Sequence, residues 1–235
     1  MKEPFILKFF RFSFTLLYGL LTRPEYQGRE NIPPSGPFLL VTNHLSYSDP
    51  PLIFLGLQRT GMVALAADTY KSNPGFRWVI ENAGGVWINR GSGDRGAIKA
   101  ALAELKKGKI LGMAPEGTRS RVTHALQKGK SGAAFIASKS GVQILPIGLC
   151  GTGQVFSELK RFRRAKISFT AGPPFSLPPL DGREDKGKAI DEYTHEVMCR
   201  IAALLPDEYH GVYRGDPRIK EIQEMGQPLM GSGER

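Results

Sequence analysis

A histidine and an aspartate lie five positions apart in the polar stretch Asn43 to Asp49. Five residues of regular helix would put His44 and Asp49 on different faces, but a loop that folds back can bring the carboxylate onto one ring nitrogen. The other nitrogen would then be free to act as a general base and take a proton from a hydroxyl group. Each residue also has a purely structural interpretation, His44 as a loop histidine and Asp49 as the N-cap of a following helix.

A second group of residues could bind an anionic, hydroxyl-bearing molecule. Glu116 and Arg119 are three positions apart, next to Gly117, which permits close backbone approach by a ligand. Arginine binds phosphate with two parallel hydrogen bonds, and glutamate can accept hydrogen bonds from a polyol. Either Arg90 or Arg119 alone would be an ordinary surface charge. Together with the histidine and aspartate, they favour a phosphate-bearing hydroxyl compound as the acceptor.

The elements that position these residues follow from short apolar runs and helical periodicity. Strands are expected over 37–41, 62–66, 86–89, 110–114, 142–149 and 167–170, and helices over 51–57, 94–107, 130–139 and 185–205. This alternation favours an α/β domain with a largely parallel sheet. The stretches at 43–49, 85–90, 115–120 and 145–147 would then fall at strand ends, where open α/β sheets bind their ligands.

The chain of 235 residues suits one sizeable domain with small appendages. We assign residues 24–206 to this domain, 1–23 to a helical segment and 207–235 to a polar C-terminal tail. Residues 24–37 are rich in Gly, Pro and polar residues and are interpreted as a connection into the first core strand.

The formal net charge of +10 favours an anionic partner. Residues 1–23 are rich in Phe and Leu and carry basic residues, but their longest uncharged run, 12–22, has 11 residues, against about 20 needed to span a bilayer. Such a segment can lie in a membrane interface, although it could instead cap the core. The basic patch 160–166 could face lipid headgroups, dock an acidic carrier protein or coenzyme A phosphates, or be a solvated hairpin.

No metal site, disulfide or bound cofactor is expected. Cys150 and Cys199 are far apart and are interpreted as buried thiols in a reducing compartment. The remaining histidines, at 124, 195 and 210, show no ligand spacing.

Four ordered blocks resemble the glycerolipid acyltransferase family, which includes the 1-acylglycerol-3-phosphate acyltransferases. Asn43 to Asp49 resembles the first block, NHxSxxD, and Gly85 to Gly91 the second. Pro115 to Ser120 matches the third block, PEGTRS, completely, and Ile144 to Ile147 is similar to the fourth. The likeness covers about residues 35–175. It implies the fold of that family, a largely parallel mixed sheet flanked by helices. The composition of residues 1–23 adds an N-terminal amphipathic helical segment at the membrane interface.

The resemblance also implies roles for single residues. His44 would deprotonate the acceptor hydroxyl, and Asp49 would hold its ring. Arg90, Glu116, Gly117 and Arg119 would surround a glycerol phosphate, with Ser46 and Thr118 as secondary contacts and Pro146 shaping the acyl site. The chain lacks a GxSxG elbow, and neither cysteine is near the blocks, so no acyl-enzyme is expected.

The activity so implied is transfer of a fatty acyl group from acyl-CoA or acyl carrier protein to the sn-2 hydroxyl of lysophosphatidic acid. The product would be phosphatidic acid, made at the cytoplasmic face of an anionic membrane. The same chemistry on a lyso-ornithine lipid or another lysophospholipid is an alternative. A non-catalytic basic module that binds lipid or nucleic acid is a less favoured alternative. It would give the histidine–aspartate pair and the PEGTRS block no function, and the sequence has no RNA-binding signature.

Overall fold

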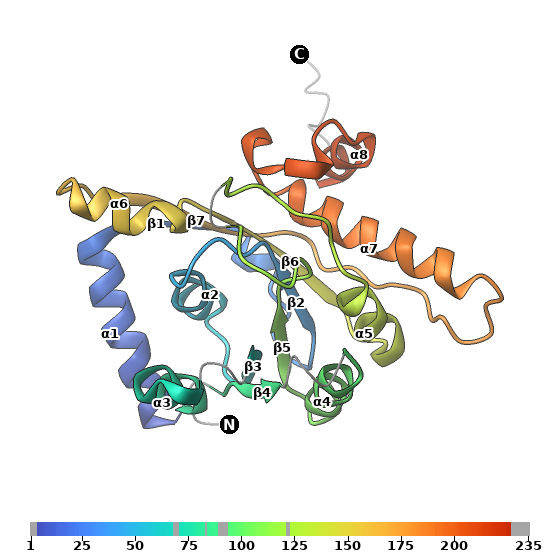
Figure 1. Cartoon of the computed structure of the whole chain (residues 1–235), viewed down its shortest axis with the longest axis horizontal. Coiled ribbons are helices and arrows are strands. Elements are labelled where there is room, and N and C mark those ends of the chain that lie inside the picture. Colours follow the sequence, from blue (N-terminus) through green and yellow to red (C-terminus); the bar gives the residue numbers. More distant parts are fainter. Residues whose placement is uncertain (1–3, 68–70, 83, 89–93, 121–122, 227–235) are drawn as a thin grey trace, which may run out of the picture.

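A mixed α/β sheet forms the centre of the computed structural model of the chain, which describes residues 4–67, 71–82, 84–88, 94–120 and 123–226 (Figure 1). Its seven strands have the order β1-β7-β6-β2-β5-β3-β4. They are β1 Thr22–Gln27, β2 Leu39–Thr42, β3 Met62–Ala67, β4 Val86–Ile88, β5 Ile110–Met113, β6 Ile144–Cys150 and β7 Ala165–Ala171. Neighbouring strands are parallel except β6 and β7, which confirms the predicted, largely parallel mixed sheet.

Helices cover both faces of this sheet (Figure 1). One hydrophobic core lies under α1 Phe5–Leu21, α2 Asp49–Leu57 and α6 Val155–Lys160. The other lies under α4 Asp94–Lys106, α5 Gly132–Ser140 and α7 Lys186–Ala202. The fully buried strand β2 serves both cores, since Leu39 and Val41 face one of them and Leu40 faces the other. This two-sided burial explains its continuous run of apolar residues.

The expected strands and helices of the middle of the chain are present, with shifts of a few residues at their ends. Gly141 ends α5 in the left-handed conformation, with φ of 68°, which favours glycine. Two helices in the middle of the chain were not predicted at their observed positions. They are α3 Pro74–Asn82, expected as a loop or short helix over 68–77, and α6.

The prediction of an irregular connection over residues 24–37 is wrong in its first part. Residues 22–27 form β1, which pairs in parallel with β7 at the edge of the sheet. Pro24 argued against a strand here, because proline cannot donate a ladder hydrogen bond; at the edge of a sheet this missing donor is tolerated. The 3-10 helix η1 Arg29–Asn31 then leads toward β2.

Residues 207–226, assigned to a polar tail, contain ordered elements. They form η5 Asp207–Tyr209, η6 Gly211–Tyr213 and α8 Pro217–Gly226. Ile219 of α8 and His210 are buried, and Ile219 belongs to the core beneath α7. Tyr209, Tyr213 and Ile222 also pack against this core, whereas Val212 and Met225 are exposed.

The helical segment expected at the N-terminus is present as α1. Its contact with a membrane stays a prediction. Phe10 and Tyr18 face inward, whereas several of its Phe and Leu side chains are exposed. Within the described part of the chain, no helix is both long and apolar enough to cross a bilayer.

Candidate active site

His44 and Asp49 form the pair that their spacing suggested. Nδ1 of His44 lies 2.6 Å from Oδ2 of Asp49, and the histidine side chain is 31% exposed. With Nδ1 carrying the proton that it donates to the carboxylate, Nε2 keeps its lone pair. Among the described residues, Nε2 makes no hydrogen bond, so it is free to accept a proton from a bound molecule.

The loop brings the pair together by wrapping around the carboxylate. Oδ2 of Asp49 also accepts hydrogen bonds from the backbone N–H groups of Leu45, at 2.7 Å, and Ser46, at 2.9 Å. Asp49 is therefore not the N-cap of α2: it is the first helical residue, and Ser48 precedes it as N-cap. Its carboxylate points back at the loop instead of forward at the helix.

Thr152 completes the environment of this carboxylate from another part of the chain. Its hydroxyl donates a hydrogen bond of 2.5 Å to Oδ1 of Asp49. Ser46 Oγ in turn donates to the Thr152 carbonyl at 3.0 Å. Asp49 is 1% exposed and Thr152 fully buried, so the carboxylate is fixed by protein donors on both oxygens.

Glu116 holds the histidine backbone. Its Oε1 accepts the His44 N–H at 3.1 Å, and its Oε2 accepts the Ser120 hydroxyl at 3.0 Å and the Gln127 N–H at 2.9 Å. The Ser120 N–H donates to the His44 carbonyl at 2.8 Å. Burial raises the pKa of Glu116 above its ordinary value despite these hydrogen bonds. With 2% exposure, Glu116 ties the PEGTRS loop to the histidine loop from within the protein.

Asn43 anchors the same loop on its other side. Its side-chain amide donates to the Leu149 carbonyl and its amide oxygen accepts the Leu149 N–H, both at 2.8 Å. A side chain thus extends the backbone pairing of β2 with β6 by one residue. This explains why the first block begins with asparagine at the end of β2.

Arg119 lies over the ring of Tyr47, with its guanidinium carbon 3.8 Å from the ring centroid. Its Nη2 donates to the Tyr47 hydroxyl at 3.1 Å. This stacked arrangement holds a guanidinium beside the histidine loop. Thr118, next to it, is exposed.

Gly117 has a left-handed backbone, with φ of 69°, that favours glycine. A Cβ at this position would lie 3.0 Å from Nζ of Lys130 and 3.2 Å from its Cδ. The close approach that Gly117 permits is therefore taken up by the Lys130 side chain, which was not predicted as a site residue.

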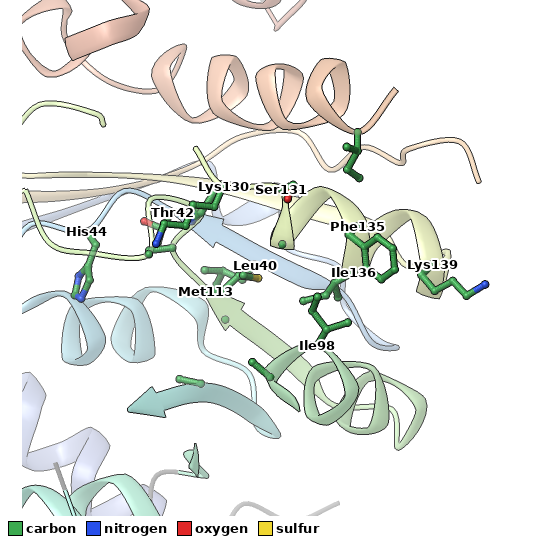
Figure 2. A pocket seen from close by; sticks show the side chains of 18 of the residues that line it. Leu40, Thr42, His44, Ile98, Met113, Lys130, Ser131, Phe135, Ile136 and Lys139 are labelled. Carbon is green, nitrogen blue, oxygen red and sulfur yellow. The ribbon is translucent and has the colours of Figure 1, made fainter. Parts of the chain in front are cut away.

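A cavity of about 900 Å³ starts at His44 and runs between β2, β5, α4 and α5 (Figure 2). Figure 2 shows His44 at one end of the labelled residues and Lys139 at the other. Its walls are largely apolar, including Ile53, Met62, Ile98, Met113, Phe135 and Ile136. A cavity of this size and character can enclose a long apolar chain.

The structure separates the predicted site residues into groups. His44, Asp49 and Gly117 line the cavity, whereas Glu116 lies behind His44. Pro146 is buried in the middle of β6, beside Val41, and is not among the described residues that line the cavity. The strand end expected at 145–147 instead lies at Cys150, and the turn after it supplies Thr152. Arg90 lies outside the described residues.

Three residues near the site were not predicted as site residues from the sequence: Tyr47, Lys130 and Thr152. Tyr47 lies inside the first block, and its aromatic ring at an exposed loop position was a usable signal. Lys130 and Thr152 had no comparable signal, because a lysine before a helix and a threonine after a strand are common in ordinary surfaces.

A histidine, cysteine and aspartate also converge away from the cavity. His195 Nε2 lies 2.6 Å from Asp216 Oδ2, and Cys199 Sγ lies 3.5 Å from the same nitrogen. Their ligand atoms are close enough to be considered as metal ligands. The direct hydrogen bond satisfies the histidine and aspartate without an ion, so we assign the group to the contact between α7 and the segment before α8.

The fold and the site define an α/β protein with a histidine–aspartate pair at the mouth of a deep apolar cavity. The chain belongs to the Acyltransferase family, whose model matches residues 23–150.

Curated relatives agree with this assignment. The chain is 31% identical over 199 residues to a 1-acyl-sn-glycerol-3-phosphate acyltransferase of Chlamydomonas reinhardtii, covering 81% of this chain and 56% of the relative. It is 32% identical to the chloroplastic 1-acyl-sn-glycerol-3-phosphate acyltransferase LPAT1 of Arabidopsis thaliana, covering 65% of this chain and 44% of the relative. It is also 36% identical to a lyso-ornithine lipid O-acyltransferase of Pseudomonas aeruginosa, covering 49% of this chain and 44% of the relative. The chain thus spans about half the length of these relatives.

The fold is similar to a solved structure. The crystal structure of the 1-acyl-sn-glycerophosphate acyltransferase PlsC from Thermotoga maritima superposes with a TM-score of 0.64 at 23% identity. The match covers 95% of this chain and 80% of that chain. This likeness confirms the predicted fold class.

Proposed function

We propose that this protein transfers a fatty acyl group from an acyl thioester to the free sn-2 hydroxyl of 1-acyl-glycerol 3-phosphate, forming phosphatidic acid. The observation that carries this proposal is the free Nε2 of His44 at the mouth of the apolar cavity, with Nδ1 held 2.6 Å from Asp49. A base beside a space for an acyl chain is what direct acyl transfer to a hydroxyl requires.

The reaction follows from this geometry in one transfer. Nε2 of His44 takes the proton of the acceptor hydroxyl while the hydroxyl oxygen attacks the thioester carbonyl carbon. The Asp49 carboxylate stabilises the imidazolium that forms. The carbon–sulfur bond then breaks, and the leaving thiolate takes the proton back from the imidazolium. No side chain is acylated, and no metal or bound cofactor takes part.

The phosphate of the acceptor would bind at the outer side of the PEGTRS loop. Arg119 is stacked on Tyr47 beside the histidine loop, and the ammonium group of Lys130 lies across Gly117. Two cations at this position suit a dianionic headgroup. Thr118 is exposed on the same loop and could donate a further hydrogen bond. The Glu116 carboxylate is occupied by protein donors, so its role here is to hold the loop.

Coenzyme A and acyl carrier protein are the two candidate carriers of the thioester, and the acyl chain would occupy the cavity. Acceptor and product each carry acyl chains, whose burial is worth about 0.8 kcal/mol per methylene, so they reside in a bilayer. We therefore propose that the protein works at the cytoplasmic face of a membrane, with the exposed apolar side of α1 in the interface.

A lyso-ornithine lipid is the second candidate acceptor, because the chain is also similar to a lyso-ornithine lipid O-acyltransferase. The base and the cavity do not distinguish the two headgroups. The two cations beside the PEGTRS loop favour the phosphate-bearing acceptor, since an ornithine headgroup itself carries a positive amine.

The test is a two-way panel with the purified full-length protein. Lysophosphatidate, other lysophospholipids and lyso-ornithine lipid are each offered with acyl-CoA and with acylated carrier protein, and His44→Ala serves as the blank. We expect phosphatidate to be the fastest product. Preference for lyso-ornithine lipid would replace the proposed acceptor, and no transfer to any lyso-lipid would refute the activity.

A further inference from the structure

The turn between α6 and β7 presents an unsupported aromatic side chain to solvent. Phe162 at its tip is 99% exposed. Its backbone is left-handed, with φ of 57°, a conformation that glycine or asparagine adopts more readily than a bulky residue. Neither packing nor backbone preference within the chain accounts for phenylalanine at this position, which points to a contact outside the chain.

Beside this tip lies a cleft of about 630 Å³ with a basic lining. Its charged residues are Arg23, Arg163, Arg164, Lys166 and one carboxylate, Glu158. Two of the cations are held in register, because Arg23 of β1 pairs with Lys166 of β7 in the parallel ladder. The cleft can therefore accept an anionic group from solvent.

Arg164 joins this region to α1. Its guanidinium donates to the carbonyl of Thr22, at 3.0 Å from Nε, and to that of Gly19 at the end of the helix. The tip and α1 thus lie at the same flank of the molecule, as Figure 1 shows. Exposed apolar side chains continue along α1 from this junction; they are Leu20, Leu17, Leu16, Phe12, Phe9 and Phe5.

We propose that the α6–β7 tip is a second membrane contact, in which Phe162 enters the interface and the basic cleft binds the phosphate of an anionic phospholipid. The positive cleft complements an anionic leaflet, and the apolar residues of α1 continue the same surface. An acidic protein partner would account for the cations alone. It would leave the fully exposed phenylalanine and the adjoining apolar face of α1 without a ligand.

This contact would fix the rotation of the protein on the membrane. One helix lying in an interface leaves the molecule free to roll about the helix axis, whereas a second contact beside its end prevents this. α1 also touches the site directly, since the Tyr18 hydroxyl donates to the Ser48 carbonyl at 2.6 Å. The tip would thereby set the direction in which the histidine loop faces the bilayer.

The experiment measures binding of the full-length protein to vesicles without substrate, so it does not depend on the proposed activity. Vesicles contain phosphatidylcholine alone or with phosphatidylglycerol. Phe162→Asn suits the left-handed backbone while removing the apolar ring, and Arg163→Glu with Lys166→Glu reverses the cleft. The matched controls are Val212→Ser, exposed in η6, and Lys188→Glu with Lys220→Glu, exposed on α7 and α8.

We expect Phe162→Asn to weaken partitioning to both vesicle types roughly tenfold, without loss of thermal stability. The cleft reversal should weaken binding to anionic vesicles roughly thirtyfold and remove most of the preference for them, whereas its control, of equal net charge, should have a much smaller effect. Turnover of a short-chain acceptor dissolved as monomers should be unchanged in both tip variants.

Wild-type vesicle binding by both tip variants would overturn the proposal. If that result came with slower transfer from acylated carrier protein only, the surface would be a protein-docking site instead. Equal weakening by the two charge reversals would show that net charge, and not the cleft, attracts the membrane.

Discussion

The hydroxyl of Thr152 donates a 2.5 Å hydrogen bond to Oδ1 of Asp49, while Nδ1 of His44 lies 2.6 Å from Oδ2 of the same carboxylate. The aspartate is thus clamped between the candidate base and a residue from the turn after β6. Both oxygens have protein partners, so the carboxylate cannot rotate without losing a hydrogen bond. The direction of the histidine ring depends on this clamp.

Removing the Thr152 hydroxyl should slow turnover although this residue touches no substrate. Thr152→Val keeps the shape but leaves Oδ1 of Asp49 buried without a donor, which costs about 1–3 kcal/mol of stability. We expect kcat to fall about tenfold as the pair loses its orientation. Steady-state kinetics and thermal unfolding measure the two effects, and Thr152→Ser should restore both. An unchanged kcat in Thr152→Val would show that Thr152 does not orient the histidine–aspartate pair.

His44→Ala should abolish the chemistry and spare the fold. The side chain is partly exposed, and its hydrogen bond to Asp49 is replaced in part by the two backbone donors that remain on Oδ2. The backbone N–H that Glu116 accepts is kept. Loss of a general base should lower kcat by about 10²–10⁴-fold. Near-normal acyl transfer by a folded His44→Ala variant would contradict the proposal that His44 is the general base.

Asp49→Ala should differ from His44→Ala in stability. It removes the acceptor of two backbone N–H groups, the Thr152 hydroxyl and the His44 ring, all at a residue that is 1% exposed. We expect a loss of about 3 kcal/mol or more in the free energy of unfolding. Asp49→Asn is the matched control: it retains an acceptor oxygen, so it should be more stable than Asp49→Ala while remaining slow. Equal stability of wild type and Asp49→Ala in denaturant titrations would contradict the buried clamp.

Glu116 should make stability depend on pH in a direction opposite to that of an ordinary salt-bridged carboxylate. Burial raises its pKa, so the folded state holds a proton over a window that starts near the ordinary glutamate value and extends above it. Within this window the unfolded state binds fewer protons, and stability from this group falls as the pH rises. Glu116→Gln lacks this titration. The difference in unfolding free energy, wild type minus Glu116→Gln, should therefore decrease from the acidic to the alkaline end of the window and then stay constant. A difference that grows with pH would show that the hydrogen bonds outweigh burial.

Arg119→Ala should act on acceptor binding. If the guanidinium on Tyr47 binds the phosphate, its loss should raise KM for lysophosphatidate about tenfold with little change in kcat. Tyr47→Phe keeps the stacked ring and removes only the hydroxyl bond at 3.1 Å, so its effect should be smaller. Kinetics with acceptor varied at saturating donor measures both. A decrease confined to kcat would contradict phosphate binding.

Much of the fold could be predicted from the sequence because its signals are local. Apolar runs such as residues 39–41 and the helical spacing of α4 and α7 specify elements within a few residues. β1 and α8 could not be predicted, because their stability comes from partners far along the chain: β7 for the edge strand and α7 for the short helix. Propensity within 22–27 or 217–226 is too weak to reveal either.

The candidate site divides in the same way. His44, Asp49 and the PEGTRS block could be identified from residue types and order alone, and so could the chemistry that they suggest. The contact of Asp49 with the histidine ring was expected from the sequence. Only the tertiary structure showed that Glu116, expected beside the glycerol phosphate, holds the histidine backbone instead. It alone brought Thr152 to Asp49 across 103 positions and Lys130 over Gly117. A sequence lists which groups are available, but hydrogen-bond partners far apart in the chain meet only when the parallel strands align their ends.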